Sequence, residues 1–173
     1  ITLPLCTGEL KQEMMSTKKI ALVTGGGSGL GFAIAQQFVQ HGITTIIVGR
    51  DMDKLNKAKE ALGSDCHART CDVTNLGSIP EFVNGLVQDF GQIDILVNNA
   101  GINQKKEFIE VTDEEFQRVI STNLCAVFTM SREVVKDMLK RNSGCIINIS
   151  SMAAQYGLPK VIAYSASKTA IDG

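Results

Sequence analysis

The sequence is poor in the residues that build metal sites, disulfide frameworks and membrane spans. Among 173 residues it has no tryptophan, three prolines and two histidines. Its five cysteines form no Cys-x-x-Cys pair, so we predict no metal site and no disulfide framework, and reduced thiols favour a cytoplasmic protein. No apolar run approaches the length of a transmembrane helix, and the first residues lack the basic and apolar regions of a signal peptide.

The charge pattern is nearly balanced. Lys and Arg number 17 and Asp and Glu number 18, and the basic residues form no run and no helix face. We therefore expect no nucleic-acid partner and no membrane partner. The length and the 44% hydrophobic content are typical of one globular domain with a sizeable core.

The chain divides into a short leading segment and one domain. Regular patterning begins only at Lys19, and Met15 has the character of a natural start. We expect residues 1–14 to be an upstream or vector-derived extension, and residues 15–173 to form a dinucleotide-binding domain that is incomplete at its C-terminus.

From Lys19 onward, short β-rich runs alternate with helical patterns. The expected strands are 19–24, 43–49, 66–70, 93–99 and 145–150. The expected helices are 30–41, 51–62, 78–90 and 112–141, with a last one beginning near Tyr164. Five β-α repeats predict the α/β class, a doubly wound (Rossmann) parallel sheet in a three-layer α/β/α arrangement. The final strands of such a sheet are missing from the chain.

The first two helices have an apolar stripe and clear stop signals. Leu30, Ile34 and Phe38 are spaced to share one buried helix face. Gly42 and Gly63 are placed to end the two helices.

The later helices carry start signals. Ser78 with Glu81, and Thr112 with Glu115, have the spacing of capping boxes. Pro80 falls in a first turn, where its missing N–H is tolerated.

A glycine cluster, TGGGSGLG at residues 24–31, joins the first strand to the first helix. Glycines allow a sharp turn and let a pyrophosphate approach the free N–H groups of a helix N-terminus. This position predicts a nucleotide site, and a purely structural tight turn is the alternative.

The spacing Thr-Gly-x-x-x-Gly-x-Gly, followed by further fragments in order, resembles the short-chain dehydrogenase/reductase family. The resemblance extends from about Lys19 to the end of the chain. Its other fragments are Asp72–Val73, Asn98–Gly101, Asn123, Ser151 and the Tyr-x-x-x-Lys of Tyr164 and Lys168.

Tyr164 and Lys168 stand four residues apart, which makes their side chains neighbours on a helix. A Lys charge ~4 Å from a phenolate stabilises it by about 4 kcal/mol at a dielectric of 20. This is an upper bound of about three pKa units for the tyrosine, enough for proton exchange near neutral pH. A packed tyrosine and a solvated lysine are the alternative.

The family resemblance implies a role for each catalytic candidate. Tyr164 would be the general acid/base, and Lys168 would lower its pKa and hold the nicotinamide ribose. Ser151 would hydrogen-bond the substrate oxygen, with Ser150 as the fallback and strand-end capping as the alternative for both. Asn123 would support a water-mediated proton relay from Lys168, or else satisfy a helix kink.

The resemblance also implies the cofactor contacts. Asp72 and Val73 would meet the adenine, although Asp72 could equally cap a turn. Asn98 would brace the central strand, while Ala100 and Gly101 line the cofactor, or form a structural turn. Tyr164 and Lys168 would complete the nicotinamide end, and the pyrophosphate would lie on Thr24, Gly25, Ser28, Gly29, Leu30 and Gly31.

The choice of cofactor depends on the stretch VGRD at residues 48–51. An acidic residue beyond the glycines selects NAD through the ribose 2′-hydroxyl, whereas an arginine favours the 2′-phosphate of NADP. Arg50 takes the family position where NAD users carry Asp, so we favour NADP over NAD. A solvated strand end is the alternative for Arg50.

The expected function is hydride transfer between NAD(P)H and a carbonyl/alcohol substrate, of the 3-oxoacyl thioester or the sugar/polyol type. A nucleotide-binding sensor or an inactive truncated fragment is the alternative, and we expect the chain to be part of a longer enzyme. The family implies a homodimer or homotetramer of the full-length protein, paired through its long helices, of which residues 113–141 form one.

Overall fold

The computed structural model of the chain describes residues 18–173. The predicted leading extension, residues 1–14, lies outside the described residues. Residues 15–17 at the start of the predicted domain lie outside them as well.

The described residues form one parallel five-stranded sheet in the order β3-β2-β1-β4-β5. The strands are β1 (Ile20–Thr24), β2 (Thr44–Gly49), β3 (Cys66–Thr70), β4 (Ile95–Asn98) and β5 (Cys145–Asn148). Since β1 pairs with β2 on one side and β4 on the other, the chain reverses its winding direction at β1. The predicted doubly wound α/β fold is confirmed.

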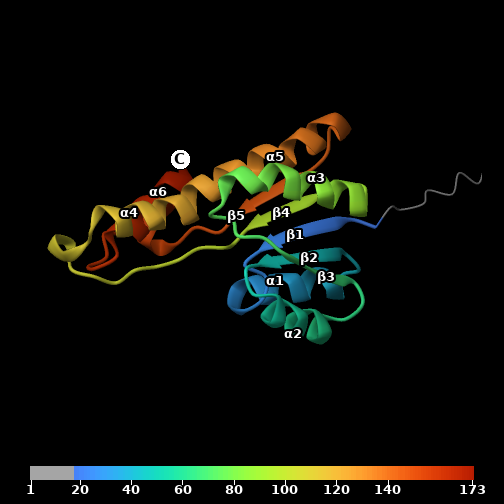
Figure 1. Cartoon of the computed structure of the whole chain (residues 1–173), viewed down its shortest axis with the longest axis horizontal. Coiled ribbons are helices and arrows are strands. Elements are labelled where there is room, and N and C mark those ends of the chain that lie inside the picture. Colours follow the sequence, from blue (N-terminus) through green and yellow to red (C-terminus); the bar gives the residue numbers. More distant parts are fainter. Residues whose placement is uncertain (1–17) are drawn as a thin grey trace, which may run out of the picture.

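Helices cover both faces of this sheet, as Figure 1 shows. The helices are α1 (Gly29–Gln40), α2 (Met52–Leu62), α3 (Ile79–Phe90), α4 (Asp113–Ile120), α5 (Ala126–Arg141) and α6 (Ile162–Asp172). Helices α1 and α2 lie on one face and α3 and α5 on the other, while α4 and α6 project beyond the carboxyl ends of the strands (Figure 1). Parallel sheets bind ligands at that end.

Short helical turns connect the longer elements. They are η1 (Leu76–Ser78), η2 (Phe108–Glu110), the π-helical turn η3 (Ser121–Cys125) and η4 (Met152–Ala154). The predicted long helix 112–141 is thus α4, η3 and α5 in succession, because a π-turn interrupts the α-helical pattern at Asn123.

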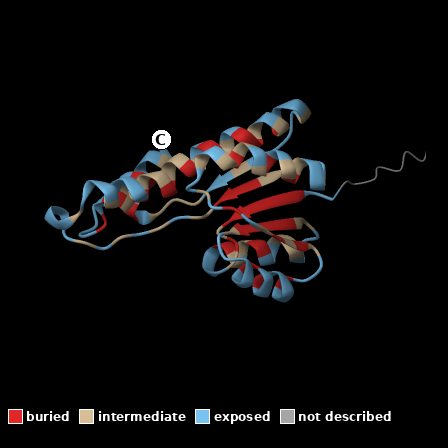
Figure 2. Cartoon of the chain, in the orientation of Figure 1, coloured by how far each residue is buried: buried red, intermediate tan, exposed pale blue. Residues whose placement is uncertain are grey.

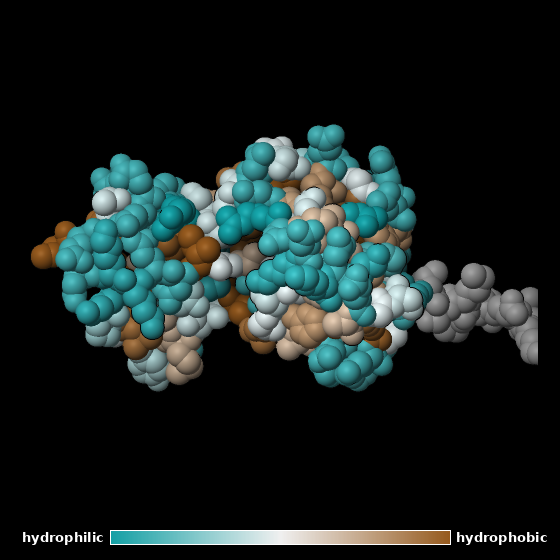
Figure 3. Space-filling view, turned by 60° about the horizontal axis from the view of Figure 1, so that its bottom comes forward, coloured by the Kyte–Doolittle hydropathy of each residue, from teal (hydrophilic) through white to brown (hydrophobic). Residues whose placement is uncertain are grey.

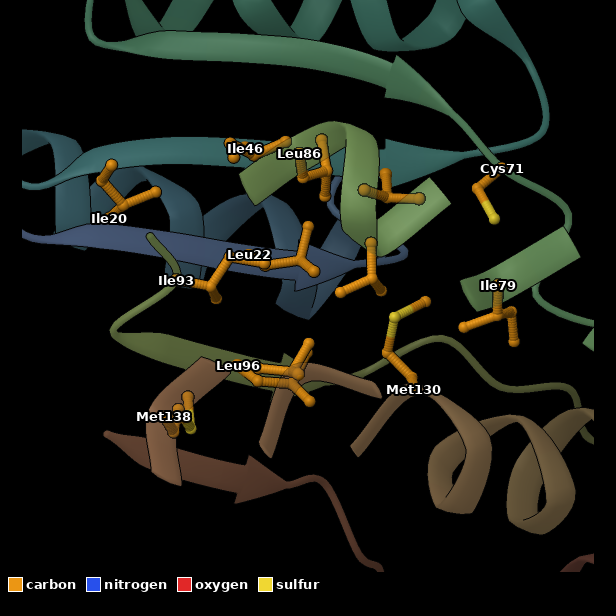
Figure 4. Packing of buried hydrophobic residues seen from close by; sticks show 13 residues of the cluster. Ile20, Leu22, Ile46, Cys71, Ile79, Leu86, Ile93, Leu96, Met130 and Met138 are labelled. Carbon is orange, nitrogen blue, oxygen red and sulfur yellow. The ribbon is translucent and has the colours of Figure 1, made fainter. Parts of the chain in front are cut away.

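Two apolar clusters hold the layers together, one on each face of the sheet. Figure 4 shows the first cluster, in which Leu22 and Leu96 of the sheet lie near Leu86 of α3 and Met130 of α5. The central strands are buried along their length, whereas β5, at an edge of the described sheet, is largely exposed (Figure 2). The core therefore fixes β1, β2 and β4, whose carboxyl ends form the site.

The glycine stop signals are confirmed, and the apolar stripe of α1 is confirmed in part. Gly42 and Gly63 follow their helices with φ of 74° and 94°, a region that glycine adopts without strain. Ile34 and Phe38 pack against the second cluster. Leu30 is 57% exposed, so its place in the stripe was wrong. It stands in the first turn of α1, beyond the strand end that the helix covers.

One of the two capping boxes is confirmed. Thr112 and Glu115 form both reciprocal hydrogen bonds at the start of α4. The box predicted for Ser78 and Glu81 is wrong, because Ser78 closes η1 with helical backbone angles and its hydroxyl donates to Asn75 O at 2.9 Å. Pro80 does lie in the first turn of α3.

Hydrophilic side chains cover much of the face in Figure 3, and separate apolar patches lie at the end that α4 and α6 form. Within residues 18–173, no helix combines the length and the apolar character that crossing a membrane requires.

Candidate active site

The glycine-rich turn after β1 is packed so closely that side chains would not fit. A Cβ on Gly31 would overlap Gly25 O and lie 2.5 Å from Asn99 Nδ2. A Cβ on Gly25, whose φ is +67°, would lie 2.9 Å from the same amide nitrogen. The glycines therefore let α1 approach the turn after β4, which brings the two crossovers on either side of β1 together.

Thr24 supports this turn through the hydrogen bonds of its side chain. Its hydroxyl donates to Val97 O at 3.3 Å and accepts from the N–H groups of Asn99 and Ala100, both at 3.0 Å. The single proton and both lone pairs are thereby used. Thr24 shapes the turn through backbone contacts, so any contribution to phosphate binding is indirect.

The N-terminus of α1 suits an anion. Ser28 precedes the helix with extended backbone angles, its hydroxyl makes no capping bond, and the first turn contains no acidic residue. The first N–H groups of α1 and the positive end of its dipole thus lack a side-chain partner of their own. Gly29, with φ of +56° and open space around it, leads into this turn.

A cavity of about 570 Å³ opens beside the glycine turn. Of the predicted cofactor residues, it is lined by Gly25, Ser28, Arg50, Asp72, Val73, Ala100 and Gly101. Thr24, Gly29, Leu30, Gly31, Asn98, Tyr164 and Lys168 are not in its lining. The set fits a dinucleotide, because glycines and free backbone N–H groups would suit a pyrophosphate and an arginine follows the end of β2.

Two charged residues that line the cavity, Arg50 and Asp51, differ in the partners that they already have. Asp51 is the N-cap of α2 and accepts from Lys54 N at 3.0 Å. Arg50 is exposed and makes no ion pair with any residue from 18 to 173. Both residues line the cavity, and of the two only Asp51 already uses a side-chain oxygen in a hydrogen bond within residues 18–173.

Asp72 caps a turn and lines the cavity at the same time. Its Oδ1 accepts from Thr74 N at 3.0 Å and from Thr74 Oγ1 at 2.7 Å. These hydrogen bonds lower the pKa of Asp72, and the nearby Arg50 charge adds to the effect. Both interpretations of Asp72 are thus compatible with its position.

A second, more open groove of about 820 Å³ adjoins the first at Arg50, Cys71 and Asp72, and lies between the end of β3 and α3. It contains no part of the glycine turn.

Asn98 braces the sheet. Its Nδ2 donates to Ser131 Oγ at 2.9 Å and to Asn148 Oδ1 at 2.8 Å, which joins β4 to α5 and to β5. Asn99, which the sequence interpretation did not single out, holds the glycine turn by donating from Nδ2 to the carbonyls of Thr24 and Gly25. The repeated Asn in NNAG was the available signal.

Tyr164 and Lys168 are brought together on α6. The Lys168 Nζ lies 5.8 Å from the centroid of the Tyr164 ring and donates to Ile149 O at 2.6 Å. Only 4% of Lys168 is exposed, and this burial lowers its pKa, against the opposing charge of Asp172. Two of the three ammonium protons have no acceptor among residues 18–173.

Gly101 connects this pair to the cavity. A Cβ on Gly101 would lie 3.9 Å from Lys168 Nζ and 3.2 Å from Asn123 Oδ1. Gly101 also lines the cavity, so the lysine lies behind a lining residue without lining the cavity itself.

The two serines at the end of β5 differ. Ser151 Oγ accepts from Ala153 N at 3.2 Å and so caps η4, which leaves its own proton available for donation. Ser150 Oγ is buried and has no partner among residues 18–173. The geometry thus favours Ser151 over Ser150 as a hydrogen-bond donor to a ligand.

Asn123 lies in the middle of η3 and is fully buried. Its Oδ1 accepts from Ile102 N at 2.8 Å, and its Nδ2 donates to Ile102 O at 2.9 Å and to Ser167 Oγ at 3.0 Å. Since both amide protons are used, the side chain has none left to donate to a water beside Lys168.

Comparison with known proteins agrees with this geometry. A profile described as short chain dehydrogenase matches residues 19–173. The 3alpha-hydroxysteroid dehydrogenase of Mediterraneibacter gnavus is 35% identical over 165 residues, which are 92% of this chain and 66% of that protein. The 3-oxoacyl-acyl-carrier-protein reductase of Thermotoga maritima is 38% identical over 158 residues, 90% of this chain and 64% of that protein.

A solved structure of an actinorhodin polyketide ketoreductase variant with NADPH superposes with a TM-score of 0.85 at 35% identity, covering 89% of this chain and 61% of that one. The chain thus spans slightly less than two thirds of the length of the curated relatives it matches.

The fold and the glycine-lined cavity define a doubly wound α/β domain, a type that binds ligands at the carboxyl ends of its strands. More specifically, the chain belongs to the short chain dehydrogenase family.

Proposed function

We propose that this protein transfers a hydride between NADP(H) and a carbonyl/alcohol substrate, with Tyr164 as the general acid/base. The observation that carries the proposal is the Tyr164–Lys168 pair, whose ammonium group adjoins Gly101, a residue that lines the cavity. A nicotinamide cofactor bound there would supply or accept the hydride.

Each catalytic candidate has a role consistent with its contacts. In the reducing direction, Tyr164 donates a proton to the substrate oxygen, and the nearby Lys168 charge stabilises the phenolate that forms. Ser151 donates its free proton to the same oxygen. Lys168 retains two protons for a ribose hydroxyl, and any contribution of Asn123 to a proton relay passes through its backbone.

Turnover by the purified protein tests this assignment. The panel holds NADPH and NADH with an acetoacetyl thioester, a keto sugar and a 3-ketosteroid, the last because one relative is named for hydroxysteroid oxidation. We expect Tyr164→Phe to lower kcat by about 10²–10⁴. Tyr156→Phe is the matched control, since Tyr156 is 61% exposed and the chain has only two tyrosines.

Equal turnover by wild type and Tyr164→Phe would remove the tyrosine from the mechanism. Tight NADPH binding without turnover on the whole panel would instead favour a nucleotide sensor. Turnover of the acetoacetyl thioester alone would place the protein with the 3-oxoacyl reductases, whereas turnover of the keto sugar would support the polyol alternative.

The preference for NADP rests on Arg50. Arg50 lines the cavity without an ion-pair partner among residues 18–173, while Asp51, which also lines it, uses its Oδ1 to cap α2. Arg50→Ser is expected to weaken NADPH binding by about 1.5–3 kcal/mol, the range for hydrogen bonds to charged groups, and to leave NADH binding nearly unchanged. Equal weakening of both cofactors would contradict a 2′-phosphate contact.

We also propose a homodimer or homotetramer in the cytoplasm. Phe128 and Leu139 of α5 are 62% and 73% exposed, and their spacing of eleven residues places them on one helix face. Sedimentation of the wild type and of Phe128→Lys tests the contact; a wild-type monomer would contradict it.

A further inference from the structure

Ser167 is a fully buried hydroxyl on the helix that carries both catalytic candidates. It follows Tyr164 by three residues and immediately precedes Lys168. Its Oγ donates to Tyr164 O at 2.7 Å and accepts from Asn123 Nδ2 at 3.0 Å. Ser167 occupies an unspecified position of the Tyr-x-x-x-Lys spacing and does not line the cavity.

The bond to Asn123 completes a chain of contacts between three segments that are distant in sequence. Ile102, in the loop after β4, exchanges two hydrogen bonds with the Asn123 amide, and the remaining amide proton goes to Ser167. Ile102 and Asn123 are separated by 21 residues, and Asn123 and Ser167 by 44. The loop beside Gly101, the π-turn η3 and α6 are thereby joined.

Water does not replace this bond readily, because Asn123 and Ser167 are each 0% exposed. Without the Ser167 hydroxyl, one buried amide proton would lose its acceptor, and η3 and α6 would shift to satisfy it. Because Tyr164 and Lys168 are both on α6, such a shift would move them together relative to Gly101, which precedes Ile102 in the loop that Asn123 holds. A displacement of 1 Å at a catalytic group can lower a rate by about 10²-fold.

We infer that Ser167 is a positioning residue, whose hydroxyl sets the placement of α6 against the π-turn and thereby places Tyr164 and Lys168 at the cofactor site. The catalytic consequence rests on the proposed function, whereas the placement itself does not. Ser167 touches no substrate or cofactor atom in this assignment and acts through the backbone of Tyr164 and through Asn123.

The first experiment compares Ser167→Ala with Ser165→Ala in the purified protein. Ser165 is on the same helix, and its hydroxyl is also buried but has no partner among residues 18–173. We expect Ser167→Ala to lower kcat about tenfold or more with the KM for NADPH changed less than about twofold, and Ser165→Ala to change neither by more than about twofold. Wild-type kcat in Ser167→Ala would overturn the inference.

A second measurement does not require turnover. Acetic anhydride acylates exposed lysines, and mass spectrometry compares Lys168, 4% exposed, with the exposed Lys57 of α2 as internal reference. Ser167→Ala is expected to raise the relative acylation of Lys168 by about fivefold through local opening, while Ser165→Ala leaves it unchanged. If the wild type turns over no substrate, the proposed function fails, yet this labelling still decides the role of Ser167.

The hydrogen bond itself is tested by a double-mutant cycle. If Ser167 acts through Asn123, Ser167→Ala adds little acylation in an Asn123→Ala background, whereas additive effects would overturn the inference. Should Ser167→Ala fail to fold by circular dichroism, Ser167→Cys replaces it, since a thiol has a similar size and a weaker hydrogen bond. An increase in Lys168 acylation in that variant supports the assignment, and wild-type acylation overturns it.

Discussion

The close approach at Gly31 predicts that two identical helix substitutions will have opposite effects on stability. Gly31 lies in α1 and Gly85 in α3, and neither has a positive φ. Helix propensity alone favours alanine over glycine by about 1 kcal/mol at both positions. Space is available at Gly85, where a Cβ would meet nothing within 4 Å, but not at Gly31.

The magnitude follows from the atoms that a new Cβ would meet. At Gly31 these are Gly25 O, which it would overlap, and Asn99 Nδ2 at 2.5 Å. The carbonyl belongs to the backbone of the turn and cannot rotate away, so α1 itself would have to move. Overpacking of this kind destabilises by about 1–3 kcal/mol, and a backbone clash belongs near the upper limit. After the propensity gain, Gly31→Ala should lower the free energy of unfolding by about 2 kcal/mol, and Gly85→Ala should raise it by about 1 kcal/mol.

Urea denaturation followed by far-ultraviolet circular dichroism measures this difference. With m of about 1–3 kcal/mol/M, a separation of about 3 kcal/mol moves the two midpoints apart by roughly 1–3 M. Gly31→Ala should also weaken NADPH binding, because movement of α1 disturbs the Asn99 bonds to the glycine turn. A free energy of unfolding for Gly31→Ala that equals or exceeds that of the wild type would refute the steric argument, and with it the reason for a glycine at this position.

Three further outcomes follow from local geometry. Thr112→Ala removes the capping box of α4 and should lower the unfolding free energy by about 1 kcal/mol in thermal or urea melts; an unchanged midpoint would contradict the box. Hydrogen bonds from Thr112 N and Lys106 lower the pKa of Glu115 from 4.5 to about 2. This depressed pKa stabilises the folded state at pH values above the unfolded pKa of 4.5, and the stabilisation is lost as the pH falls from about 4.5 toward 2. Glu115→Gln should therefore flatten the dependence of the unfolding free energy on pH over that interval. Burial raises the pKa of Cys66 to about 11, so iodoacetamide at pH 8 should alkylate the exposed Cys145 well before Cys66, as peptide mass spectrometry would show; faster reaction of Cys66 would contradict its burial.

Much of the fold and part of the site follow from patterns that are local in sequence. The strand–helix alternation, the glycine stops at Gly42 and Gly63, and the capping box at Thr112 each depend on residues within a few positions of one another. The same is true of Tyr164 and Lys168, because helix geometry alone makes residues four apart neighbours. The sequence could therefore predict the order of elements and the proximity of Tyr164 to Lys168.

The hydrogen-bond partners of the site candidates depend on contacts between residues far apart in the chain. Thr24 bonds to residues 73 to 76 positions away, so its hydroxyl is already engaged in supporting the turn. Asn123 meets Ile102 and Ser167 across 21 and 44 residues, and these contacts use both of its amide protons. No spacing in the sequence reports such bonds.

The local sequence thus determined which elements form and in what order, because propensity, capping and periodicity act over one or two turns of backbone. Only the packed sheet decided which polar groups were already paired, and so which remained free to meet a ligand. Arg50 and Asp51 show this division, since they are adjacent in sequence and both line the cavity, and only the folding of α2 commits an oxygen of the aspartate to its cap.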